Sequence, residues 1–181
     1  MIDIKFLEIR PEDLEMIRHW RNSPDVNKYM FTDTKISKSQ QIKWFERISN
    51  ENNSRYWIVE VEKKKIGVVY LFNIDLKNSK CIWGFYLGDT SIRGKGIGSK
   101  IKFKLLTYVF EELKLNKLYG EILPFNKKSI KMHEKFGFTK EGYLRNHISK
   151  NGSFIDVIFV GLLQKEWYDQ KESLYSKIFD F

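Results

Sequence analysis

Residues 93–98 read Arg-Gly-Lys-Gly-Ile-Gly, between a segment typical of a strand, Cys81–Leu87, and a segment typical of a helix that continues to about Leu113. A helix N-terminus leaves backbone N–H groups without helical partners and carries about half a positive charge, so phosphate oxygens bind there. Glycines let the backbone approach such a ligand closely, because no Cβ intervenes. The predicted phosphate-binding loop consists of Arg93, Gly94, Lys95, Gly96, Ile97 and Gly98.

Taken alone, this glycine-rich loop is a weak signal. The dinucleotide-binding pattern G-x-G-x-x-G and the Walker pattern G-x-x-x-x-G-K-[ST] are both absent, and a plain turn that needs glycine for its geometry is the alternative. The net charge of +9 also fits a lysine-rich solvated surface, or a basic stripe for nucleic acid. Positive side chains nevertheless gather around the loop, which favours the phosphates of a small molecule: Arg93, Lys95, Lys100, Lys102 and Lys104.

Outward from the loop, apolar periodicity and turn residues predict a series of helices and strands. Ser37 and Gln40 have capping-box spacing, Gly137 suits the left-handed position after a helix, and Asn151-Gly152 predicts a hairpin. The order predicts an α/β or α+β fold with a mixed sheet. After an initial strand we expect a helix from Pro11 to about Asn22, a helix from Ser37 to about Ile48, strands Tyr56–Val61, Ile66–Phe72 and Cys81–Leu87, the helix after the loop, strand Leu118–Leu123, helix Asn126–Phe136, strands Phe138–Ile148 and Phe154–Leu162, and a C-terminal helix in 164–181.

Two of these segments resemble motifs of the GNAT acetyltransferases. Arg93-x-x-Gly96-x-Gly98 matches the family's R/Q-x-x-G-x-G/A signature, and Asn126–Phe138 is similar to its later motif, N-x-x-A/S-I-x-L-Y-x-K-x-G-F. The resemblance covers nearly the whole chain, because the order of strands and helices is also similar. It implies a single GNAT domain over residues 1–181, with a mixed, mostly antiparallel sheet of about six to seven strands that is splayed at the cofactor site and flanked by helices.

The resemblance also implies acetyl-CoA as the cofactor and indicates which residues hold it. The pyrophosphate would lie on the backbone N–H groups of the glycine loop. The pantetheine would bond to the backbone of the preceding strand at Phe85, Tyr86 and Leu87. Asn126 and Ser129, from the later motif, complete the expected cofactor contacts.

Direct transfer of an acetyl group to an amine requires a base for the amine and an acid for the leaving thiolate. The resemblance implies that Glu121 faces the cleft as the base, acting directly or through water; a solvated strand residue is the alternative. His133 stands where the family has tyrosine, and imidazole can donate a proton near neutral pH, so it is the candidate acid. A solvated helix residue is the alternative for His133. Cys81 lies in an apolar strand and is expected to pack in the core.

Two stretches bear on the acceptor amine, Trp20–Phe31 and His147–Val157. Both resemble the N-acetyltransferases of pseudaminic-acid biosynthesis, which acetylate the 4-amino group of a UDP-linked deoxy-amino sugar. The aromatic–Met–aromatic run at 29–31 could stack on uracil or on the apolar face of a sugar, and Arg21 or a lysine could meet the diphosphate. Ordinary packing is the alternative. The expected acceptor contacts are Arg21, Tyr29, Met30, Phe31 and His147.

The second stretch is less specific, because N-G-x-[FY]-x-D-V also resembles enzymes that acetylate ribosomal-protein N-termini and polyamines. A strongly basic enzyme suits a phosphate-bearing acceptor better than a polyamine, because like charges repel. We therefore expect a nucleotide-sugar N-acetyltransferase. Protein N-termini or other small amines are alternative acceptors, and a catalytically idle CoA-binding module is the alternative of a different class.

Cysteine content and the absence of long apolar runs bear on the compartment of the protein. One cysteine, Cys81, excludes an internal disulfide, and neither a membrane-spanning run nor a signal peptide is visible. We therefore expect a cytoplasmic protein that binds no membrane, no nucleic acid and no metal. The segment 164–181 carries Trp167, Leu174 and Tyr175 at roughly helical spacing, and it could cap the sheet or meet a second subunit in a homodimer.

Overall fold

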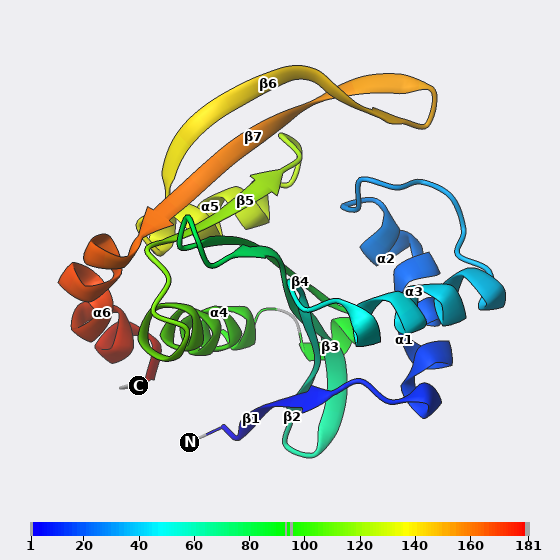
Figure 1. Ribbon diagram of the computed structural model, residues 1–181, viewed down its shortest axis with the longest axis horizontal. Helices are drawn as coiled ribbons and strands as arrows, with labels where there is room; N and C mark the ends of the chain where they lie inside the picture. Colours follow the sequence, from blue (N-terminus) through cyan, green and yellow to red (C-terminus); the bar gives the residue numbers. More distant parts are fainter. Residues whose placement is uncertain (1, 93, 95, 180–181) are drawn as a thin grey trace. The chain divides into compact units, whose positions relative to one another are not determined.

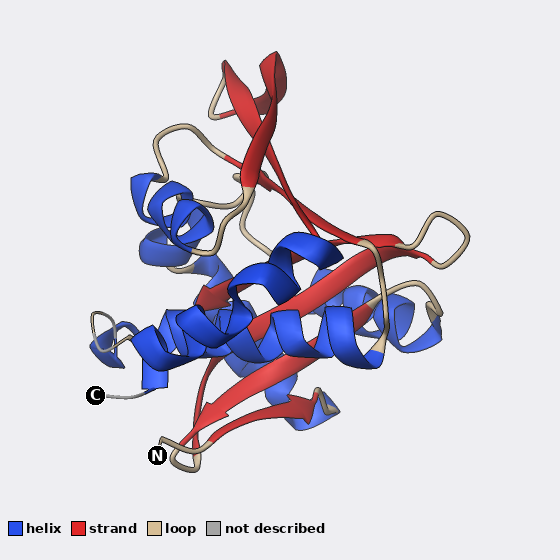
Figure 2. Cartoon of the chain, turned by 90° about the vertical axis from the view of Figure 1, so that its left-hand side faces the viewer, coloured by secondary structure: helices blue, strands red, loops and turns tan. Residues whose placement is uncertain are grey.

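The strand before the glycine loop and the helix after it are both present, and the flanking elements follow the expected order (Figure 1). The computed structural model describes residues 2–92, 94 and 96–179. Its strands form a seven-stranded sheet in the order β1-β2-β3-β4-β5-β7-β6, flanked by helices (Figure 2). The pairs β1–β2, β2–β3, β5–β7 and β6–β7 are antiparallel, whereas β4–β5 is parallel. The mixed, mostly antiparallel sheet is confirmed, and its splaying stays a prediction.

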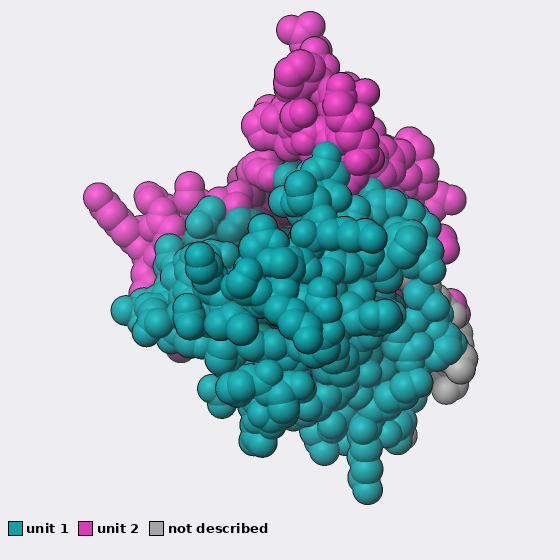
Figure 3. All heavy atoms as spheres, turned by 90° about the vertical axis from the view of Figure 1, so that its right-hand side faces the viewer, with its two compact units in different colours: residues 1–73, 83–93 teal, residues 74–82, 94–181 magenta. Residues whose placement is uncertain are grey.

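The chain divides into two compact units, which are described separately (Figure 3). The first unit comprises residues 1–73 and 83–93, and the second comprises residues 74–82 and 94–181. Strands β3 and β4 each contribute residues to both units. A single domain over residues 1–181 stays a prediction.

In the first unit, local sequence explains where the helices begin. Ser37 Oγ accepts a hydrogen bond from the Gln40 N–H, and Gln40 Oε1 accepts one from the Ser37 N–H, which confirms the capping box. The loop expected after Asn22 contains a short helix, because Pro24 can occupy a first helical position. The elements are β1 (Ile4–Glu8), a 3-10 turn (Pro11–Asp13), α1 (Leu14–Asn22), α2 (Pro24–Asn27), α3 (Lys38–Asn50), β2 (Arg55–Val61), β3 (Lys64–Asp75) and β4 (Lys80–Leu87).

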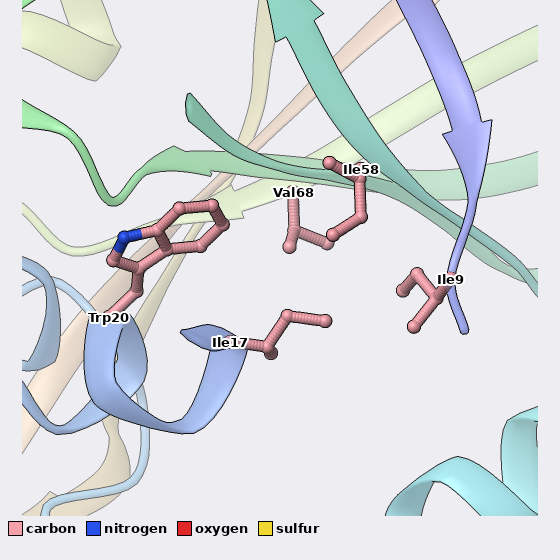
Figure 4. Packing of buried hydrophobic residues seen from close by; sticks show 5 residues of the cluster. All are labelled: Ile9, Ile17, Trp20, Ile58 and Val68. Atoms are coloured by element: carbon pink, nitrogen blue, oxygen red, sulfur yellow. The ribbon is translucent and has the colours of Figure 1, made fainter. Parts of the chain in front are cut away.

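A compact apolar cluster forms a core of this first unit (Figure 4). Helix α1 contributes Ile17 and Trp20, which lie three residues apart and therefore share one helix face. They pack toward Ile58 and Val68 of the strands and toward Ile9, just after β1. Burial of each such side chain contributes about 1.5–3 kcal/mol, so this face of α1 is the main reason that the helix docks.

In the second unit, strand β5 has one buried face. Leu118, Gly120 and Ile122 are buried, and Tyr119 and Glu121 between them are half-buried, as the period of two in a strand requires. The elements are α4 (Ile97–Thr107), a π-helical turn (Tyr108–Glu112), β5 (Lys117–Ile122), α5 (Lys127–Lys135), β6 (Thr139–Lys150), β7 (Ser153–Leu163) and α6 (Gln164–Phe179).

The β6–β7 hairpin turns at Asn151 and Gly152, whose φ angles of +51° and +75° confirm the predicted tight turn. Gly137 has a φ angle of +73° directly after α5, which confirms its predicted left-handed conformation. The pairing of β5 with β7 ends at Ile122 and Ile158. The β6–β7 hairpin therefore extends past the end of β5 (Figure 1). No helix of the described residues is long and apolar enough to cross a membrane.

Candidate active site

Gly94 and Gly96 of the glycine loop are exposed just before α4 begins. Gly94 and Gly96 have φ angles of +86° and +73°, and a Cβ at either position would meet nothing within 4 Å. Gly96 is the N-cap residue of α4, and its carbonyl accepts hydrogen bonds from the N–H groups of Ser99 and Lys100. Glycine at these two positions therefore permits the left-handed backbone conformation. No neighbouring atom would exclude a side chain there.

The first two residues of α4, Ile97 and Gly98, have no carbonyl one turn earlier in the helix for their N–H groups. An open glycine loop followed by such N–H groups fits the pyrophosphate of CoA, because anions bind at helix N-termini. Arg93 and Lys95, the charged residues predicted to assist, lie outside the described residues.

Asn126 caps the next helix, α5. Its Oδ1 accepts a hydrogen bond from the Ser129 N–H at 3.2 Å, which fixes the orientation of the side-chain amide. The Nδ2 group of Asn126 makes no hydrogen bond among the described residues. This amide therefore has a donor that could reach a ligand carbonyl, and its contact with the pantetheine stays a prediction.

His133 lies on the buried side of α5 and is only 6% exposed. Its Nδ1 lies 2.7 Å from the Ser129 carbonyl oxygen, and its ring meets Phe138 edge to face at 4.8 Å between centroids. Burial lowers the pKa of His133 to about 3, with a smaller contribution from the Lys102 amine. The imidazole is therefore neutral at pH 7, and the proton it holds is on Nδ1, donated to that carbonyl. These contacts favour packing, and they do not support the expected role as general acid.

Lys102 does not belong to the basic surface around the loop, where we expected it. The side chain is 0% exposed, because Lys102 faces the core side of α4. Its Nζ lies 3.9 Å from the ring centroid of Phe138 and 5.1 Å from that of Phe136. Burial holds the pKa of Lys102 well below its usual value, since a charged amine is poorly solvated there. Counting charges along the chain could not reveal this orientation.

Glu121, the predicted base, is half-buried on β5 opposite Phe159 of β7. Tyr119 lies two residues earlier on the same face, and its ring stacks on Phe159 at 5.1 Å between centroids. Burial raises the pKa of Tyr119, and the nearby Glu121 carboxylate raises it further. We had not singled out Tyr119, although the period of two along a strand places it beside Glu121.

In the first unit, the residues predicted to contact pantetheine lie at the end of β4. Phe85, Tyr86 and Leu87 are all half-buried, and the Phe85 ring stacks on Trp83 at 5.7 Å between centroids. A Cβ at Gly67 of β3 would collide with the Tyr86 carbonyl oxygen, so glycine permits a close approach of these strands.

Arg21, at the end of α1, carries an unsatisfied donor. Its Nη2 donates to Thr32 Oγ1 at 3.2 Å, and its guanidinium carbon lies 5.9 Å from the centroid of the Tyr86 ring. The Nη1 atom is buried and makes no hydrogen bond within residues 2–92, 94 and 96–179. A buried guanidinium nitrogen without a partner is costly, so an anionic acceptor group would satisfy it.

The other predicted acceptor contacts are divided between the units. Tyr29, Met30 and Phe31 are half-buried in the loop after α2, with the Lys28 ammonium 5.2 Å from the Tyr29 ring centroid. His147 is exposed on β6, where the pairing with β7 is irregular between Leu144 and Ile148. The first unit thus carries Arg21, Tyr29, Met30, Phe31, Phe85, Tyr86 and Leu87, and the second carries Gly94, Gly96, Ile97, Gly98, Glu121, Asn126, Ser129, His133 and His147.

Comparison with known proteins identifies the family of the chain. Residues 4–139 match the family model described as an acetyltransferase (GNAT) domain. The chain is 30% identical over 140 residues to acetyltransferase PseH of Campylobacter jejuni, covering 77% of this chain and 85% of that protein. It is 26% identical to a spermidine N(1)-acetyltransferase of Vibrio cholerae over 161 residues, covering 88% and 92% of the two chains.

The fold is also that of a solved structure. The crystal structure of spermidine N-acetyltransferase from Vibrio cholerae in complex with CoA and spermine has a TM-score of 0.84 at 24% identity, with 92% of this chain and 98% of that chain covered. At this identity the likeness concerns the fold. In the described part of this chain, no group of three or more histidine, cysteine, aspartate and glutamate side chains is arranged to hold a metal ion.

Proposed function

The chain belongs to the GNAT family of acetyltransferases, and from that premise we propose that its acceptor is the 4-amino group of a UDP-linked 4-amino-4,6-dideoxy sugar. It is an acetyl-CoA-dependent N-acetyltransferase. Three facts support the acceptor: the two stretches that resemble the pseudaminic-acid enzymes, the 30% identity to acetyltransferase PseH, and the net charge of +9. A diphosphate acceptor is attracted to a basic enzyme, and a polyamine is repelled.

The observation that carries the proposal is Arg21. Its guanidinium holds one hydrogen bond to Thr32 and a buried Nη1 without a partner in the described part of the chain. A phosphate oxygen would accept from Nη1 in a charge-assisted bond, which is stronger than a neutral one. The half-buried run Tyr29–Phe31 would then offer aromatic and thioether surface to the apolar face of the sugar or to the base.

The chemistry of transfer requires that the acceptor amine lose its proton. When bound, acetyl-CoA supplies the thioester carbonyl that the amine attacks. Glu121 takes the proton, directly or through a water molecule, from its half-buried position on β5. Because His133 is buried and neutral, with Nδ1 turned to the Ser129 carbonyl, we assign the proton of the leaving thiolate to solvent.

Holding the cofactor is assigned to backbone groups and one amide. The N–H groups of Gly94, Gly96, Ile97 and Gly98 bind the pyrophosphate, because glycine leaves the loop open and α4 begins there. The backbone of Phe85–Leu87 and the Asn126 Nδ2 bind the pantetheine. These contacts orient the thioester.

Two other amine classes compete with the nucleotide sugar. Spermidine acetyltransferases are 24–26% identical to this chain and share its fold, which makes a polyamine the main alternative. A protein N-terminus is the other alternative, because the last hairpin also resembles enzymes that acetylate ribosomal proteins. The charge of +9 argues against the polyamine.

The test is thiol release from acetyl-CoA with three acceptors in parallel: a UDP-4-amino-4,6-dideoxy sugar, a ribosomal-type N-terminal peptide and spermidine. We expect turnover with the sugar and little with the other two. Arg21→Lys keeps the charge but loses the planar guanidinium, so it should raise KM for the sugar and leave KM for acetyl-CoA unchanged. Turnover with spermidine or the peptide alone would refute the proposal.

A further inference from the structure

A hollow of about 520 Å³ lies beside the β6–β7 hairpin, and none of its lining residues is one assigned above to cofactor or catalysis. All of its walls belong to the second unit. Pro124, Phe125 and Lys127 come from the segment between β5 and α5, and the rest comes from the hairpin. The hairpin residues are Tyr143, Asn146, Phe154, Ile155 and Asp156.

Three aromatic rings around this hollow are unusually open to solvent. Phe125 is 47% exposed, Tyr143 is 48% exposed and Phe154 is 72% exposed. Exposing single apolar side chains is ordinary, but three rings around one hollow form a surface on which a flat ring can stack. The surface therefore suits a planar aromatic ligand.

The Asp156 carboxylate beside the hollow is held in position by hydrogen bonds. Asp156 accepts one hydrogen bond from the Tyr143 hydroxyl and one from the Asn146 backbone N–H, each at 2.7 Å. These two bonds lower the pKa of Asp156, so it is a carboxylate at neutral pH. Each carboxylate oxygen keeps a further lone pair, and the Asn146 side-chain amide makes no hydrogen bond among the described residues.

The backbone of β6 beside the hollow has an irregular conformation. Pairing of β6 with β7 is irregular between Leu144 and Ile148, and Asn146 within this bulge has a φ angle of +52°. A residue with such a φ costs strain, and bulges that re-aim side chains are over-represented beside functional sites. Asp156 stabilises the bulge by accepting from the Asn146 N–H.

We propose that this hollow binds the uracil ring of the acceptor. The ring stacks on Phe154 and Phe125, its N3–H donates to the Asp156 carboxylate, and the Asn146 amide donates to a neighbouring ring carbonyl. Lys127, exposed at the rim, meets a phosphate. The inference rests on the proposed nucleotide-sugar function.

Position in the chain agrees with a role in choosing the acceptor. The family match covers residues 4–139, which include the cofactor loop and Asn126. The five hairpin residues of the hollow all lie beyond that match. The residues assigned to the cofactor therefore lie inside the matched region, and five of the eight residues that line the hollow lie outside it.

The first test measures binding of UDP to the full chain by calorimetry, without any turnover. We expect Phe154→Ala to weaken UDP binding about tenfold or more, because one base stacks on that ring. Leu76→Ala is the matched control, since Leu76 is 73% exposed in the same unit but does not line the hollow. It should leave the Kd for UDP unchanged, and neither variant should change the Kd for CoA.

The second test compares UDP with CDP, because cytosine carries no hydrogen on N3. We expect CDP to bind at least tenfold more weakly than UDP, and Asp156→Asn to abolish that preference. If UDP binds and Phe154→Ala and Asp156→Asn leave both affinities unchanged, the inference is overturned while the nucleotide-sugar function stands. If UDP does not bind and the UDP-sugar is not acetylated, both the inference and the proposed function are overturned.

Discussion

At the scale of single residues, Glu121 and His133 occupy opposite kinds of surroundings. Glu121 is half-buried on β5 beside Tyr119, so solvent reaches its side chain. His133 is buried against Phe138 and bonded to the carbonyl of Ser129. Proton transfer needs a group that can gain and lose a proton near neutral pH, and burial removes that ability from the imidazole.

We expect Glu121→Gln to lower kcat by about 100-fold or more while KM for acetyl-CoA stays unchanged, because a positioned general base contributes about 10²–10⁴-fold. Steady-state thiol release across pH 6–9 measures the effect. Glu112→Gln, a change at an exposed glutamate of the π-helical turn, is the control and should behave as wild type. A kcat within twofold of wild type for Glu121→Gln would exclude this base.

The buried histidine also predicts a pH dependence of stability. Burial lowers the pKa of His133 from 6.5 to about 3, so between these values the unfolded chain binds a proton that the folded chain does not. The free energy of unfolding therefore falls as pH drops below 6.5. At pH 4.5 this loss is about 2–3 kcal/mol, at about 1.36 kcal/mol per pKa unit.

His133→Phe should lack this loss, so its stability should fall less between pH 7 and pH 4.5 in urea unfolding. The exposed His147 is the control, because His147→Phe should keep the wild-type pH dependence. Kinetics of His133→Phe distinguish a packing role from a catalytic role of the histidine. Its kcat should stay within about threefold of the wild-type value. A drop of 100-fold with intact folding would restore the acid role.

Lys102 makes a second prediction at this scale. Burying an amine at 0% exposure costs solvation, and methionine has a similar length without the charge. We expect Lys102→Met to raise the free energy of unfolding by about 1–3 kcal/mol. Lys104→Met, at an exposed position of the same helix, should change it by less than about 0.5 kcal/mol. A large loss of stability in Lys102→Met would mean that the charge is needed.

At the scale of elements, the glycine loop and α4 act together. Gly96 is left-handed and caps α4, so a side chain there strains the backbone although the surrounding space is open. Gly152 has nearly the same φ, +75°, and equally open surroundings in the β6–β7 turn. The two glycines therefore differ in location and not in conformation.

Both Gly96→Ala and Gly152→Ala should lower stability by about 1–2 kcal/mol, the cost of a left-handed L-residue. Only Gly96→Ala should also raise KM for acetyl-CoA, because it alters the N–H groups at the start of α4. Thermal unfolding and initial rates measure the two effects. An equal rise in KM in both variants would show that destabilisation, and not the loop, is responsible.

Helix α6 holds the end of α4 through the π-helical turn. The wider turn frees the Phe110 carbonyl, which accepts hydrogen bonds from Gln164 Nε2 and the Tyr168 hydroxyl. Trp167 donates from Nε1 to Glu111 Oε1 and packs against Phe103. The C-terminal segment, expected either to cap the sheet or to meet a second subunit, is thus bound to α4 within its own unit.

At the scale of the whole molecule, the net charge of +9 affects the association of the protein with charged substrates more than it affects folding. Attraction of a diphosphate acceptor should weaken with salt, because the Debye length shortens from about 10 Å at 0.1 M. At saturating acetyl-CoA, KM for the UDP-linked acceptor should rise several-fold between about 50 and 300 mM NaCl. A nucleotide-free amino sugar is the control, and an equal rise for both would exclude the electrostatic contribution.

Local chemistry made much of the fold predictable. The capping box at Ser37, the turn at Asn151-Gly152, the left-handed Gly137 and the order of elements all follow from residues close together in sequence. Strand ends differed by up to three residues, as in β3, because pairing with a neighbour and not composition decides where a strand ends. The glycine loop was recognisable for the same local reason.

The amino-acid sequence by itself determined the family and the alternation of helices and strands, and it singled out the glycine loop, since these depend on spacing along the chain. Only the tertiary structure decided that Lys102 and His133 are buried, that Arg21 keeps a donor without a partner in the described residues, and that Asp156 braces a bulge beside three exposed rings. The physical reason is that burial and hydrogen bonding depend on neighbours brought together by folding, which no spacing along the chain specifies.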